Sequence, residues 1–276
     1  MTSPMELVKQ LREMTGAGIL DCKKYLERAN NNLDEAIKLI RSEAGVKADK
    51  KGSRIAAEGL VKFYEDDDNV LILELNSETD FVARSDDFIA LSDNLANILL
   101  KNNFNDIENQ VTSEISSTIS KLGENIKLRR HQRIKKENHL FGYTHNNKIA
   151  AVVELNDKND ELAKDICMQI VASNPLALDE SQIDSETLNS EKEIYKKELE
   201  KLDKKDDIKR NILDGKMKKF ISENTLLNQP FVKDPSTSLS KLLKDNQILS
   251  YIRYEVGEGI EKKTEDFAQE VYNQIS

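Results

Sequence analysis

The stretch VLILELN, residues 70–76, decides how the middle of the chain folds. Its nearly continuous apolar run is typical of a strand that is buried on both faces. Sliding the sequence along itself by 80 residues brings AAVVELN (150–156) onto this stretch and Asp160 onto Asp80. We therefore interpret the middle of the chain as two related units, each of which runs strand, turn, strand and helix.

Helical patterns precede this repeat. Three short amphipathic segments occupy the first 45 residues, and the first of them starts at Ser3-Pro4 and stops before Gly16. The third is predicted to end at Gly45. Residues 46–54 (VKADKKGSR) have no apolar face, so we expect a flexible basic linker there.

Other helices interrupt and follow the second copy of the repeat. Residues 186–225 are charged and carry sparse apolar positions, which predicts a protruding antiparallel helix pair with its turn at DKKDD. LRRHQRI (128–134) indicates one further strand. The tail predicts a helix over 239–245, a strand over 248–256 and a helix from Thr264 to Gln274.

Composition excludes several classes of protein. The formal net charge is −9, which argues against a general nucleic-acid binder. The two cysteines are far apart and fit a reducing, cytoplasmic location. We find no signal peptide, no membrane span, no phosphate-binding loop and no catalytic or metal-ligating constellation, so we expect no catalytic residue, no metal and no cofactor.

One aromatic residue stands out in SETDFVARSDDF (77–88). Ser85-Asp86 predicts a fresh helix N-cap, which makes TDFV a short turn of its own. A buried Phe81 is the ordinary expectation, but the matching position of the second copy holds Glu161, and a core site would seldom tolerate that charge. Phe81 is therefore predicted to serve function, and Asp80, which matches Asp160, to serve partly as a helix cap.

Three stretches together resemble one family, bacterial translation elongation factor Ts. They are TGAGILDCKKYLERANNNLDEAI (15–37), SETDFVARSDDF (77–88) and IRYEVGEGIEKKTEDFAQEV (252–271), and the resemblance also includes QPFVKDPS (229–236). The resemblance runs in order along essentially the whole chain.

This resemblance implies an α+β fold with a three-helix, UBA-like N-terminal bundle, a core of two related α+β subdomains, an antiparallel coiled-coil insertion and a C-terminal helical module. The implied boundaries are 1–45 for the bundle, 46–54 for the linker, 55–139 and 140–276 for the two core subdomains, 184–226 for the coiled coil and 260–276 for the C-terminal module.

The resemblance also implies a function. Members exchange guanine nucleotide on elongation factor Tu, the GTPase that carries aminoacyl-tRNA, and their TDFV motif dislodges its Mg²⁺. That motif stands here as Thr79, Asp80, Phe81 and Val82. Further partner contacts are expected at Lys23, His145, Gly257 and Phe267.

The expected partner is elongation factor Tu, GDP-bound or nucleotide-free, with no direct nucleic-acid or membrane contact. A homodimer or a 2:2 complex stays open. On this reading the protein is not an enzyme, because it makes and breaks no covalent bond. The alternative is a ribosome- or RNA-associated protein that uses the basic run RRHQRIKK (129–136) and the basic residues of 47–54.

Overall fold

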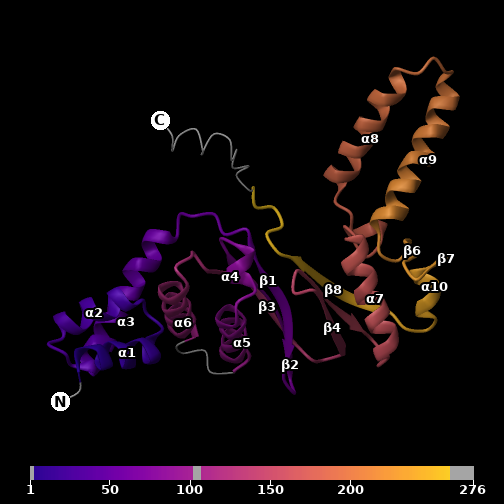
Figure 1. The fold of residues 1–276 in the computed structure, drawn as a ribbon. Helices are drawn as coiled ribbons and strands as arrows, with labels where there is room; N and C mark the ends of the chain where they lie inside the picture. The colour runs from indigo at the N-terminus through magenta and orange to yellow at the C-terminus, as the bar shows by residue number, and fades with distance from the viewer. Residues whose placement is uncertain (1–2, 102–106, 262–276) are drawn as a thin grey trace.

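A computed structural model describes residues 3–101 and 107–261 (Figure 1). Three helices come first: α1 (Pro4–Thr15), α2 (Ile19–Arg28) and α3 (Leu33–Lys51). The Ser3 hydroxyl accepts a hydrogen bond from the amide of Glu6 at 3.3 Å, and Gly16 closes α1 with a φ of 67°. These contacts confirm the predicted start and end of α1. The three helices share a core of their own, which includes Leu11, Cys22, Tyr25, Leu26 and Ala36.

The predicted end of the third helix at Gly45 is wrong, because α3 continues to Lys51. A glycine inside a helix costs roughly 1 kcal/mol relative to alanine, which tertiary contacts can outweigh. Here α3 contacts α6 (Ile107–Leu122), and the Lys51 ammonium donates to the carbonyl of Gly123 at 2.6 Å. The expected linker over 46–54 is therefore helical as far as Lys51, and its role as a linker stays a prediction.

Two three-stranded antiparallel sheets lie at the centre, with the orders β1-β2-β3 and β4-β5-β8. Each sheet contains one hairpin of the repeat and a third strand that pairs with the second strand of that hairpin. The strands are β1 (Glu58–Glu65), β2 (Asn69–Ser77), β3 (Lys127–Lys135), β4 (His139–His145), β5 (Ile149–Leu155) and β8 (Ile248–Glu255). The strands expected at 128–134 and 248–256 are confirmed as β3 and β8.

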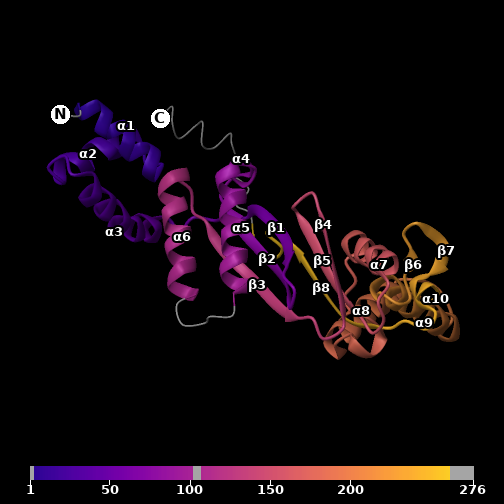
Figure 2. The same cartoon turned by 90° about the horizontal axis from the view of Figure 1, so that it is seen from below.

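Helices cover the outer face of each sheet. After the first hairpin come α4 (Asp80–Ala83) and α5 (Asp86–Leu100), and after the second comes α7 (Asp160–Ser173). The order of layers is helices, sheet, sheet, helix (Figure 2). Strand β2 is buried on both faces, as predicted, since Leu71 and Leu73 pack toward α5 while Val70 and Ile72 face the second sheet. The mixed α+β class is thus confirmed.

Two long helices, α8 (Ser185–Glu200) and α9 (Asp206–Asn224), project beyond α7 (Figure 1). They occupy the region where the sequence predicted a helix pair. The remaining elements are η2 (Glu180–Gln182), β6 (Pro230–Phe231), β7 (Asp234–Ser238) and α10 (Leu239–Leu243). Helix α6 and the β6-β7 ribbon were not predicted, and the helix expected from Thr264 to Gln274 lies outside the described residues.

Candidate functional site

Asp80, Phe81 and Val82 of the TDFV motif lie in α4, a single helical turn that follows β2, and Thr79 is its N-cap. The Thr79 hydroxyl caps this turn by accepting the amide of Val82 at 3.3 Å, while Ala83 is buried against the first sheet. Phe81 points the other way and is 84% exposed, whereas Phe88 of the next helix is fully buried. A large exposed apolar ring on a well-anchored turn is suited to contact another molecule.

A carboxylate from elsewhere in the chain anchors the motif. Glu124, between α6 and β3, accepts hydrogen bonds from the amides of Glu78 and Thr79 at 3.1 and 3.0 Å. Its other oxygen accepts the Thr79 hydroxyl at 2.6 Å. The Glu78 carboxylate in turn accepts the amide of Asn125 at 2.6 Å. This exchange of hydrogen bonds fixes the backbone just before Phe81, and no local sequence pattern marks Glu124 for this role.

The expectation that Asp80 and Asp160 act as caps is wrong. Both residues occupy the first position inside their helices, and the caps are Thr79 and Asn159, each one residue earlier. Asp80 pairs with Arg84 at 3.0 Å, and the side chain of Asp80 is half-exposed while that of Arg84 is well exposed. Its carboxylate is therefore accessible beside Phe81.

The other predicted contact residues lie on several elements. Lys23 is exposed on α2. His145 ends β4, where its ring nitrogens lie 3.3 Å from the hydroxyl of Tyr143 and 3.2 Å from the side-chain amide of Asn146. Gly257 follows β8 with a φ of 71°, a conformation that favours glycine. Phe267 lies outside the described residues.

Three of the predicted contact regions, namely the TDFV motif, the end of β4 at His145 and the turn at Gly257, lie at one end of the paired sheets. Ser77, two residues before the motif, is the register partner of Glu58, whose carboxylate pairs with Lys148 at 3.0 Å. Lys148 belongs to the turn that follows His145, and its carbonyl accepts the amide of Val256 at 2.9 Å. The motif, the β4-β5 turn and the start of the C-terminal stretch are thus linked, while Lys23 lies on α2 among the three N-terminal helices.

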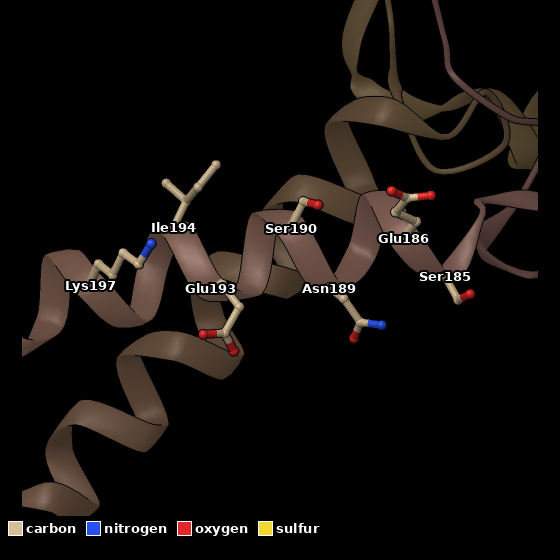
Figure 3. A pocket seen from close by; sticks show the side chains of 7 residues that line it. All are labelled: Ser185, Glu186, Asn189, Ser190, Glu193, Ile194 and Lys197. Carbon is tan, nitrogen blue, oxygen red and sulfur yellow. The ribbon is translucent and has the colours of Figure 1, made fainter.

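Two hollows on the surface of the described residues have different linings. One of about 570 Å³ lies along α8, and all seven lining residues, including Ile194 and Lys197, come from that one helix (Figure 3). Another of about 620 Å³ lies between α6 and β3 and includes His131, whose pKa burial lowers. Within the described residues, no cluster of three or more His, Cys, Asp or Glu could hold a metal ion, and no helix is long and apolar enough to cross a membrane.

The fold and the site define an α+β protein built on a repeated sheet–helix unit, with an accessible aromatic motif beside the sheet ends. The sequence model of the family described as Elongation factor TS matches residues 78–258. Proteins named Elongation factor Ts are similar along nearly the whole chain. That of Ruthia magnifica is 43% identical and covers 100% of this chain and 98% of its own. That of Alkalilimnicola ehrlichii is 41% identical and covers 99% of both chains. That of Legionella pneumophila (strain Paris) is 40% identical and covers 98% of this chain and 97% of its own.

The chain belongs to the elongation factor Ts family. Its place is accordingly in the elongation stage of protein synthesis.

Proposed function

We propose that this protein is the guanine-nucleotide exchange factor of elongation factor Tu, binding the GDP-bound GTPase, displacing its Mg²⁺ and promoting GDP release. The observation that carries the proposal is the 84% exposure of Phe81 on a turn that Glu124 holds in place. Covering a ring of this size with a partner pocket removes apolar surface from water and therefore favours binding.

Thermodynamic linkage gives the mechanism its direction. A factor that binds the nucleotide-free GTPase more tightly than the GDP-bound form must weaken GDP binding by the same factor. Mg²⁺ neutralises phosphate charge in such sites, so displacing it removes much of what retains the nucleotide. Phe81 acts as an apolar wedge, and the accessible Asp80 carboxylate acts on the polar network around the partner's metal ion. Lys23, His145, Gly257 and Phe267 supply surrounding contacts.

The test is release of fluorescent GDP from purified elongation factor Tu at increasing concentrations of this protein. The wild type accelerates release, and Phe81→Ala raises the half-saturating concentration by about 30-fold or more, as expected for an interface anchor. Its melting temperature stays within about 2 °C of the wild type because an exposed ring supports no core.

The matched control is Ile194→Ala, which truncates a 49% exposed apolar side chain on α8. It should leave exchange unchanged. No acceleration by the wild type at any concentration would refute the exchange function, and a full-strength Phe81→Ala would refute the role of the ring.

A further inference from the structure

The buried carboxylate of Glu74 joins the first sheet to the residues that follow the second. Glu74 lies on β2, on the face turned toward the second sheet, and is 0% exposed. One of its oxygens accepts the amide of Gly257 at 2.8 Å and a guanidinium N–H of Arg129 at 3.0 Å, and the other accepts Nε of Arg130 at 2.6 Å. A buried charge needs this many donors, since an unpaired one would cost several kcal/mol.

The two arginines reach the same turn that Glu74 holds. Arg130 donates to the carbonyl of Glu255 at 3.1 Å and to the carboxylate of Glu258 at 3.0 Å, and Arg129 donates to the carbonyl of Glu258. The guanidinium of Arg130 also stacks 4.2 Å from the ring centre of Tyr254. Residues 255–258 are therefore fixed to β2 and β3 by polar contacts from three side chains.

The turn at 255–258 packs closely against the residues just before β1. A Cβ added at Gly257 would lie 2.3 Å from the carbonyl oxygen of Ala57, just before β1. The turn thus sits directly on the start of the first sheet, which is also where β2 ends and the TDFV motif begins.

The matching carboxylate of the second copy has no such role. Glu154 occupies the equivalent place in AAVVELN but is partly exposed, and it accepts hydrogen bonds from the side chains of Asn138 and Ser250 at 2.8 Å. The same three letters, ELN, therefore hold a buried charge cluster in one copy and surface contacts in the other. This difference points to a task specific to Glu74.

We propose that Glu74 is a positioning residue for nucleotide exchange: it holds the turn at 255–258 against the first sheet, so that this turn and the TDFV motif meet the partner in one fixed arrangement. Glu74 lies on β2, only five positions before Thr79, so the carboxylate that holds the turn at 255–258 belongs to the strand that leads into the motif. Pre-organising two contacts on one rigid body reduces the ordering cost of docking. This inference rests on the proposed exchange function.

The test compares Glu74→Gln with Glu154→Gln in the full-length protein. Glutamine keeps the size of Glu74 but places an NH₂ group among donors that need an acceptor. We expect amide hydrogen exchange to rise in peptides covering 254–261. We also expect the half-saturating concentration for GDP release to rise about tenfold, with the rate at saturation unchanged within about twofold. Glu154→Gln should change neither quantity.

A second variant guards against misfolding of Glu74→Gln. Glu258→Gln alters a half-exposed side chain, removes the carboxylate that Arg130 contacts and should shift both measurements in the same direction by about threefold. Unchanged protection at 254–261 and unchanged half-saturation in these variants would overturn the proposal, as would a loss of protection spread evenly over the first sheet. If the wild type did not accelerate GDP release, the proposed function would be refuted instead. Amide hydrogen exchange at 254–261 would still show whether Glu74 holds this turn in place.

Discussion

Glu124→Ala tests how far the motif depends on its anchor. The substitution removes the acceptor for three donors, namely the amides of Glu78 and Thr79 and the Thr79 hydroxyl. Phe81 keeps its own atoms and its exposure, so the change affects only how well the turn that carries it is held. We expect weaker docking on elongation factor Tu without loss of the fold.

The magnitude follows from the number and exposure of these bonds. A hydrogen bond to a charged group contributes about 1.5–3 kcal/mol. Glu124 is only half-buried, so water replaces part of what is lost, and we count one bond of the three. A loss of about 1.5 kcal/mol corresponds to a roughly tenfold increase in the half-saturating concentration.

The assay is stopped-flow release of fluorescent GDP, run as a double-mutant cycle with Phe81→Ala. If Glu124 acts by holding the ring, Glu124→Ala adds little once the ring is gone. Equal tenfold effects in both backgrounds would refute the reasoning, as would full activity of the single variant. Glu137→Ala, which removes an exposed carboxylate paired with Lys135, is the control and should have no effect.

Three further measurements test the fold. Gly59→Ala should lower the free energy of unfolding by roughly 2–4 kcal/mol, because φ is 144° and a Cβ would lie 2.1 Å from a carbonyl oxygen of β2. Gly215→Ala in α9, where a Cβ would meet no atom within 4 Å, should raise it by about 0.5 kcal/mol. Urea titrations measure both changes. Burial opposes ionisation of Glu74, but hydrogen bonds from Gly257 and the arginines lower its pKa overall. Because the pKa of Glu74 is lower in the folded protein than in the unfolded chain, its ionised carboxylate stabilises the fold at pH values above the ordinary carboxyl pKa. This contribution is lost as the pH falls through the pKa of the folded state. Between about pH 5 and pH 3 the melting temperature of the wild type should therefore fall more than that of Glu74→Gln. Burial raises the pKa of Cys22 and Cys167, so a thiol reagent should label neither in the native protein and both in denaturant; native labelling would contradict their burial.

The fold was predictable where local patterns agreed with packing. The apolar run of β2 and its copy predicted both hairpins, and the Ser85 cap predicted the break between α4 and α5, which the structure confirms with a hydrogen bond from the amide of Phe88 at 3.4 Å. Helix α6 was missed although Val111, Ile115 and Ile119 recur at a spacing of four. Its many Ser and Thr residues have weak helix propensity, and packing against α5 and α3 supplies what propensity lacks.

The anchors of the candidate site were not predictable in the same way. Glu124 lies 45 positions from Thr79, and nothing near it in sequence marks it as a partner. Glu74 and Glu154 stand in identical ELN triplets, so no local rule separates a buried carboxylate from a half-exposed one. The difference arises from Arg129 and the turn at Gly257, which only the third strand and the chain after β8 bring into contact.

The basic run 129–136 shows why such contacts decide between functions. Read as letters, it is the best candidate for a nucleic-acid surface, because phosphate binding needs clustered Lys and Arg. In the fold, Arg130 neutralises Glu74, Arg133 donates to the carbonyls at the end of α5, and Lys136 pairs with Glu65 at 2.8 Å. If a guanidinium exchanged its buried carboxylate partner for an RNA phosphate, it would lose one charge-assisted hydrogen bond for each one it formed. The net free energy gained by binding RNA through this run is therefore small. These contacts favour the exchange function over the RNA-associated alternative.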